Sequence, residues 1–219
     1  MKILRNIPIV VLVALVSGCS PKGDDAGRGG FMKRLFGPSP NQLVVQMFES
    51  EDPDLRRDAI ERLSKKDWGR RGSFLKAYAI LTADPAATVR SAAVRALGRA
   101  GDAKYAKEVI EALSDREASV RSDAAVALDS ISAPEAVKPL SAGATRDVSP
   151  DVRAASARAL RHYRQPDVLE TLLRCLDDPK LAVRRRAAES LTELTGENAG
   201  TDAHAWRRIL NTKTDTNHR

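Results

Sequence analysis

The apolar pattern of this chain returns five times, with a period of 31 to 34 residues. In each copy an apolar residue precedes an arginine, and successive pairs are separated by 34, 31, 32 and 31 residues. The pairs are Leu55-Arg56, Val89-Arg90, Val120-Arg121, Val152-Arg153 and Val183-Arg184. A constant period of this size predicts stacked helical units in place of one globular core.

Each copy carries the same apolar stripe. A small residue stands four positions after the apolar anchor, at Ala59, Ala93, Ala124, Ser156 and Ala187. A leucine stands eight positions after it, at Leu63, Leu97, Leu128, Leu160 and Leu191. On a helix these positions lie within about 80° of one another. The stripe therefore predicts one buried helix face, with small residues where a neighbouring helix approaches closely.

The repeats read as pairs of antiparallel helices. We expect first helices near 42–49, 72–82, 103–113, 134–144 and 166–176, and second helices near 54–64, 86–99, 117–130, 150–162 and 180–194. Prolines at or near the starts of second helices, such as Pro85 and Pro150, agree with these ranges. Pro139 falls inside a first helix and predicts a bend there.

The arginine after each anchor needs a partner, because it lies in the first turn of a helix, where a cation opposes the helix dipole. Four copies have an aspartate five residues before the anchor. The pattern predicts a ladder of Asp/Arg contacts, within or between repeats, formed by Asp84, Arg90, Asp115, Arg121, Asp147, Arg153, Asp178 and Arg184. The first copy departs from it, since Asp52 lies only three residues before Leu55.

The pattern D-x-x-x-x-V-R-x-x-A-x-x-A-L, as in Asp84 to Leu97, resembles the HEAT repeat family over roughly residues 41–196. The resemblance implies an all-α, right-handed α-solenoid of about five HEAT-like helix pairs. After it, residues 197–210 are expected to form a C-terminal capping helix in which Trp206, Ile209 and Leu210 close the stack. The polar tail 211–219 is expected to be disordered.

The N-terminal segment reads as an export signal. Residues 1–18 have a basic start, an apolar run too short for a comfortable membrane span, and small residues at the end. Val16 to Cys19 resembles a bacterial lipobox, which implies a lipid on Cys19. An ordinary secretory signal and an uncleaved anchor are the alternatives. Ser20 stands where some bacteria read an aspartate as an inner-membrane retention signal, so the resemblance favours the outer membrane, facing the periplasm or the cell exterior.

Residues 19–40 are expected to be a flexible tether with an r.m.s. reach on the order of 25 Å. Phe31 to Gly37 within it mixes aromatic and basic residues, a composition suited to a membrane interface. Packing on the first repeat and disorder are the alternatives for this segment.

The sequence predicts no catalytic residue, no metal site and no cofactor. His162, His204 and His218 are isolated from one another, and no glycine-rich loop follows a strand. The second cysteine, Cys175, lies in an apolar helical stretch and is expected to be a buried small hydrophobe. Loss of Lys2 and Arg5 would lower the net charge of +7 to +5, a weak indication of acidic partners.

Two surface features are candidates for partner binding. Trp68 lies in the long connection Lys65 to Gly72 and is either an exposed binding anchor or a side chain packed over a repeat junction. The second feature is a basic face, which would also be explained as solvated helix surface. Its candidate residues are Arg70, Arg71, Arg161, Arg164, Arg185 and Arg186.

These observations favour a non-catalytic, lipid-anchored protein-protein interaction scaffold of the bacterial cell envelope. A membrane contact through the lipid on Cys19 and an unidentified, acidic protein partner are expected, with no small-molecule substrate. Because HEAT-like repeats also occur in bilin lyases and in DNA repair glycosylases, a bilin-lyase-type enzyme or chaperone for cofactor attachment and a nucleic-acid-binding protein are the alternatives. The export signal argues against the last.

Overall fold

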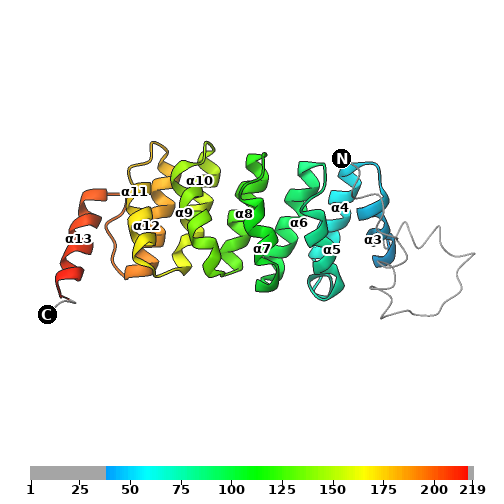
Figure 1. Ribbon diagram of the computed structural model, residues 1–219, viewed down its shortest axis with the longest axis horizontal. Coiled ribbons are helices and arrows are strands. Elements are labelled where there is room, and N and C mark those ends of the chain that lie inside the picture. The colour runs from blue at the N-terminus through cyan, green and yellow to red at the C-terminus, as the bar shows by residue number, and fades with distance from the viewer. Residues whose placement is uncertain (1–37, 217–219) are drawn as a thin grey trace, which may run out of the picture.

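The computed structural model describes the backbone of residues 38–216, and it places ten helices in five antiparallel pairs. The first helices of the pairs are α3 (Pro40–Glu49), α5 (Ser73–Leu81), α7 (Ala106–Ala112), α9 (Val137–Arg146) and α11 (Pro166–Cys175). The second helices are α4 (Pro53–Ser64), α6 (Ala87–Ala100), α8 (Ala118–Ser130), α10 (Pro150–Ala159) and α12 (Leu181–Thr195). The pairs stack side by side into an elongated array, so the predicted all-α solenoid is confirmed (Figure 1).

The second helices form one continuous layer, in which each contacts its neighbours along the stack from α4 to α12. The small residues of the stripe make this close packing feasible. Gly98 of α6 lies so close to α8 that an added Cβ would stand 2.7 Å from the Cβ of Ala127 and 2.8 Å from its Cα. The anchor valines at positions 89, 120, 152 and 183 are fully buried, as the stripe predicts.

The alternation of helices creates two edges. The turn edge consists of the turns within repeats, at 50–52, 82–86, 113–117, 147–149 and 176–180. The connection edge consists of the segments between repeats, at 65–72, 101–105, 131–136 and 160–165, and it also holds the start of α3. In Figure 1 the turn edge lies above and the connection edge below. Four 3₁₀ helices lie on the connection edge: η1 (Trp68–Arg70), η2 (Ala103–Tyr105), η3 (Pro134–Ala136) and η4 (Leu160–His162).

Pro139 lies nearer to the start of its helix than the sequence predicts. The helix expected over 134–144 begins as η3, and α9 starts only at Val137. Pro139 therefore falls in the first turn of α9, where a backbone N–H has no acceptor within the helix. Proline has no backbone N–H, and at this position its absence removes no hydrogen bond from the helix.

The C-terminal end is closed by α13 (Ala203–Thr216), which lies at the end of the stack opposite α3 (Figure 1). Trp206 is fully buried, and its indole Nε1 donates to the carbonyl oxygen of Gly200 at 2.8 Å. Ile209 and Leu210 are partly buried. The helix runs to Thr216, into the tail expected to be disordered, because extending a formed helix costs less than nucleating one.

At the N-terminal end the first repeat leaves its anchor uncovered. Leu55 is 47% exposed, whereas the four later anchors are fully buried. Among the described residues, no repeat precedes α3 and α4 to cover it.

Candidate interaction surface

The turn edge carries the predicted Asp/Arg ladder, and its contacts run between repeats. Nε and Nη2 of Arg90 donate to the two carboxylate oxygens of Asp115 in the next repeat, at 2.7 and 2.8 Å. Nη1 of Arg90 donates to the carbonyl oxygens of Asp84 and Pro85 in its own turn, at 3.0 and 3.1 Å. Each arginine therefore fixes its own turn and holds the following turn against it.

The same two-pronged contact recurs at the other rungs. Arg56 binds Asp84 with its shortest distance at 2.9 Å. Arg121 binds Asp147 and Arg153 binds Asp178, each with a shortest distance of 2.7 Å. Each aspartate also accepts a hydrogen bond from the backbone N–H two residues later, at Ala86, Glu117, Ser149 and Lys180. The carboxylates thus supply the negative charge that the starts of the second helices favour, and they offset the arginines placed there.

The ladder lowers the pKa of three of its aspartates. Hydrogen bonding from Arg121 lowers the pKa of Asp147. Burial opposes ionisation of Asp115 and Asp178, but the hydrogen bonds from Arg90 and Arg153 and from the backbone outweigh it, so the pKa of each carboxyl is lowered. These three aspartates are therefore ionised at neutral pH and pair with charged guanidinium groups.

The two ends of the ladder differ from its interior. Within the described part of the chain, Asp52 makes no ion pair with an arginine; its side chain caps α4 by accepting from the N–H of Asp54 at 2.8 Å. Arg184 donates to the carbonyl oxygens of Asp178 and Pro179, and no aspartate of a following repeat meets it within the described residues. The geometry explains the departure of the first copy: the contact that the first arginine makes is with Asp84, not with Asp52.

A second charged network covers the exposed face of the second helices. Arg95 on α6 binds Glu61 on α4 at 2.8 Å and Asp123 on α8 at 2.6 Å. Further along, Asp129 on α8 accepts from Arg158 at 3.1 Å and from Arg161 at 2.9 Å. Arg161 also reaches Glu193 on α12 at 3.0 Å. These ion pairs cross every gap between neighbouring second helices.

An exposed valine lies between the two halves of this network. Val126 of α8 is 54% exposed, and it stands three residues from Asp123 on one side and three from Asp129 on the other. Residues three apart are neighbours on a helix surface. The charged groups around Val126 are already paired with one another, so the surface presents an apolar centre inside a fixed polar frame.

The sequence could have indicated this position. Six residues after the anchor, the five copies carry Glu61, Arg95, Val126, Arg158 and Glu189. A position that is charged in four copies faces solvent, and an aliphatic residue in the fifth is then an exposed apolar side chain. The apolar stripe of buried positions does not include this position, so the stripe alone does not indicate Val126.

The six arginines proposed for a basic face do not meet on one surface. Arg161 and Arg164 lie on the connection edge at the end of the fourth repeat, and Arg161 is held by Asp129 and Glu193. Arg185 and Arg186 lie in the second turn of α12, near the turn edge, and Arg186 pairs with Glu189 at 2.7 Å. The ends of a 15-residue helix are about 20 Å apart, so the two groups point to different edges.

The side chain of Trp68 is partly exposed and is also held in place by a ring contact. It is 45% exposed and contacts Phe74, with ring centroids 5.4 Å apart. The next residue, Gly69, lies so close to the backbone of Leu63 that an added Cβ would stand 2.0 Å from the Leu63 carbonyl oxygen. The hydroxyl of the buried Tyr78 donates to the carbonyl oxygen of Gly69 at 3.0 Å. Of its neighbours, Arg70 pairs with Asp67, while Arg71 is exposed.

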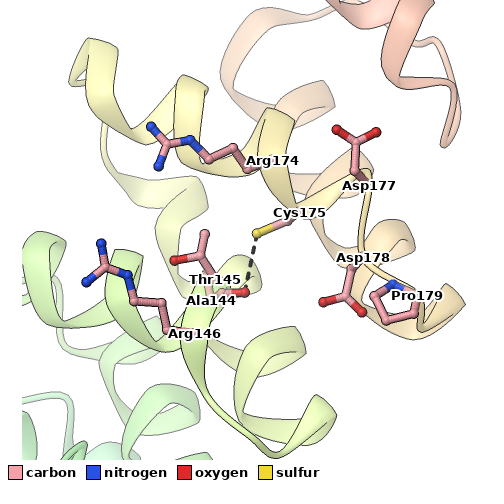
Figure 2. A pocket seen from close by; sticks show the side chains of 8 residues that line it. All are labelled: Ala144, Thr145, Arg146, Arg174, Cys175, Asp177, Asp178 and Pro179. Carbon is pink, nitrogen blue, oxygen red and sulfur yellow. Dashed lines mark hydrogen bonds between the residues drawn. The ribbon is translucent and has the colours of Figure 1, made fainter.

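A recess of about 420 Å³ lies between the fourth and fifth repeats, at the ends of α9 and α11 (Figure 2). Cys175 lies in its wall, 2% exposed, and its thiol donates to the carbonyl oxygen of Ala144 at 3.5 Å. Burial raises the pKa of the Cys175 thiol to about 12. The thiol is therefore protonated at neutral pH and is a packing group, not a nucleophile.

Within residues 38–216, no three His, Cys, Asp or Glu side chains come together as a metal site. In the same part of the chain no helix is long and apolar enough to cross a membrane. Cys19, the candidate lipid attachment site, the signal segment and Phe31 to Gly37 lie outside the described residues.

The arrangement defines an α-solenoid, a class of protein built from stacked helix pairs. The family model for HEAT repeats matches the chain at residues 75–161 and 137–204, more than half of its length. This chain therefore belongs to the HEAT repeat family.

Solved structures show the same fold. The complex of CpcE and CpcF of phycocyanin lyase from Nostoc sp. PCC7120 is similar with a TM-score of 0.64 and 23% identity, over 82% of this chain and 71% of that chain. A designed armadillo repeat protein in complex with the peptide (KR)4 is similar with a TM-score of 0.55 and 17% identity, over 71% of this chain and 82% of that one. Comparison with curated protein sequences gives no significant match.

Proposed function

We propose that this chain is a non-catalytic scaffold, anchored by a lipid on Cys19 to a bacterial membrane, that binds a protein partner on the second-helix face around Val126. The observation that carries the proposal is the exposed Val126 within a frame of paired charges on a rigid layer of helices. A surface that is ordered before binding loses little freedom on association. The likeness to a designed armadillo repeat protein in complex with a peptide supports a polypeptide as the ligand of such a stack.

The chemistry of the face defines the partner. Acidic and basic groups alternate over it and neutralise one another, so it has no strong preference for the sign of a partner's charge. A polypeptide segment that places an apolar side chain on Val126 and polar groups around it fits this surface. This modifies the expectation of an acidic partner, which rested on the net charge and on the candidate basic face.

Two measurements test the two halves of this proposal. A photo-crosslinking amino acid at position 126 in cells is expected to capture one defined protein, and the same probe at Val148, 87% exposed on the turn edge, is expected to capture none of it. The capture should be competed by the native chain and not by the Val126→Gln variant. Equal capture from both positions would overturn the assignment of the face.

Anchoring is tested by cell fractionation. The wild-type chain is expected in the membrane fraction with a diacylglyceryl group on Cys19 in the mass spectrum of its N-terminus. The Cys19→Ala variant is expected to leave that fraction. A wild-type chain that retains Met1 and remains in the cytoplasm would refute the export half of the proposal. It would leave the binding face to be tested against intracellular partners.

A second candidate, a role in attaching a bilin cofactor, is favoured by one observation, the likeness of the fold to the subunits of a phycocyanin lyase. At 23% identity that likeness concerns the fold. The test is to mix the purified chain with a bilin and record the absorption spectrum. A stable, shifted bilin band that co-elutes with the chain would favour this candidate over the scaffold.

A further inference from the structure

The connection Lys65 to Gly72 is the longest between two repeats, and it is the source of the single spacing of 34 residues. It places Trp68 on the surface of the connection edge beside the partly buried Phe74. Its polar residues are largely basic: Lys65, Lys66 and Arg71 are exposed, and no ion pair with an acidic side chain is described for them. An aromatic pair flanked in the sequence by exposed cations has the composition of an interfacial membrane contact.

The connection is built to hold this arrangement. The close approach of Gly69 to Leu63 and the hydrogen bond from Tyr78 fix the loop under the indole ring. Gly72 adopts a left-handed conformation, with φ 59°, which turns the chain into α5. A side chain that merely filled the junction would be buried, but Trp68 keeps 45% of its surface exposed. The loop therefore presents the tryptophan outward in a fixed orientation.

The start of the described chain lies on the same edge. The pair α3 and α4 is antiparallel, so the beginning of α3 at Pro40 and the end of α4 at Ser64 face the same side of the first repeat (Figure 1). The 37 residues that precede the described chain include Cys19 and the sequence FMKRLFG at 31–37. Any anchor on that part of the chain enters the stack at the edge that carries Trp68.

We infer that Trp68, with Phe74 and the cations of the 65–72 connection, is a second membrane contact that rests on a bilayer with anionic headgroups. The inference rests on the proposed anchoring at Cys19. Lipid and loop together would orient the stack with its connection edge toward the bilayer and its turn edge away from it. The second helices then run along the membrane normal, and their exposed face stays open to a partner.

Depth-dependent fluorescence quenching tests this contact. The full lipidated chain is bound to phosphatidylcholine vesicles with or without phosphatidylglycerol, and some lipids carry brominated acyl chains. The chain has two tryptophans, and Trp206 is buried in the cap at the far end of the stack. We expect several-fold stronger quenching in the wild type than in Trp68→Phe, together with a blue shift of the Trp68 emission that requires phosphatidylglycerol.

Charge reversal provides matched variants. K66E/R71E changes two exposed cations on the connection edge, and K180E/R185E changes two exposed cations at the turn edge. We expect K66E/R71E to abolish the Trp68 quenching and K180E/R185E to leave it unchanged. Loss of quenching in both pairs would attribute the effect to net charge alone and overturn the assignment of the edge.

Flotation of the chain with vesicles separates the two proposals. A wild-type chain that floats, and does so only with Cys19 intact, but whose Trp68 emission is neither quenched nor shifted, overturns the contact and leaves the anchor in place. A chain that does not float overturns the anchor and the contact with it. Circular dichroism of each variant confirms that the helical stack is intact before the vesicle measurements.

Discussion

The two edges of the stack are made by opposite means. On the turn edge, the same contact is repeated at four successive steps: a guanidinium group clamps its own turn and the aspartate of the next. On the connection edge the segments range from five to eight residues and differ in composition, and each contains a short 3₁₀ helix of different sequence. The regular edge holds the stack together, whereas the irregular edge carries the features that distinguish this chain from a generic repeat.

The difference shows where to look for function in a repeat protein. A residue type that recurs at the same position in every copy serves the fold, as the buried anchors and the ladder arginines do. A residue that breaks the pattern is free to serve something else. Val126 and Trp68 both break it, one by an aliphatic side chain at a charged position and the other by lying in the longest connection.

Loss of an interior rung should give the largest effect. We expect Asp115→Ala to lower the free energy of unfolding by about 3 kcal/mol, because the nearly buried guanidinium of Arg90 is left without its carboxylate. Urea-induced unfolding followed by circular dichroism measures the loss.

Asp52→Ala is the matched control, because Asp52, like Asp115, accepts a hydrogen bond from the backbone N–H two residues later but makes no ion pair with an arginine among the described residues. Its loss should be about 1 kcal/mol, the ordinary value of a helix cap. Equal losses in the two variants would show that the ladder contributes only as a set of caps.

Much of this edge was predictable from the sequence. The helix ranges and the identity of the ladder residues follow from periodicity, since a spacing fixes which residues share a face of one helix. The direction of the contacts does not follow, because Arg90 is near both Asp84 of its own repeat and Asp115 of the next in any stacked arrangement. Only the geometry of stacking decides that the carboxylate comes from the next repeat and the carbonyl oxygens from its own.

The surface was less predictable. The six arginines chosen as a basic face lie on different edges, since sequence proximity within a repeat does not report which end of a helix a residue occupies. The sequence indicates Arg161 as a partner-binding cation, yet it is held by Asp129 and Glu193, each 32 residues away in sequence. Pairings between repeats of this kind depend on the rotation of one helix pair against the next, which no single copy encodes.

Close packing between second helices should give the next largest effect. Gly98→Ala is expected to lower the free energy of unfolding by about 2 kcal/mol, because the new Cβ collides with the backbone of Ala127 and forces α6 and α8 apart.

Gly143→Ala is the control. Its new Cβ would meet the hydroxyl of Ser156 at 2.7 Å. A side-chain hydroxyl can rotate and alanine favours the helix by about 1 kcal/mol, so this change should be close to neutral. A comparison of thermal midpoints measures both, and a loss in Gly143→Ala as large as in Gly98→Ala would contradict this account.

Acid should weaken the ladder with a defined sign. The pKa values of Asp115, Asp147 and Asp178 are lowered in the folded chain, so on acidification the unfolded chain takes up protons first. The stabilisation is therefore complete above the unfolded carboxyl pKa of about 3.9 and is lost as the pH falls through the lower folded values. Urea midpoints measured between about pH 6 and pH 3 should fall at the acid end. The fall should be shallower in Asp147→Asn, and an unchanged slope would refute the assignment.

The smallest effect should come from the exposed network on the second helices. Arg95 is 31% exposed and bridges Glu61 and Asp123, so water and salt screen its pairs more than they screen the ladder. We expect Arg95→Ala to lose about 0.5 to 1 kcal/mol at low salt, and most of that loss should disappear at high salt. The loss in Asp115→Ala should persist at high salt, because its partner Arg90 is 8% exposed. Parallel urea titrations at the two ionic strengths measure both losses, and an equal salt dependence would mean that the two networks share one environment.

Arg95 also frames Val126, so the same variant tests the proposed binding face. Crosslinking from position 126 should weaken in Arg95→Ala even under salt conditions in which the stability of the chain does not change.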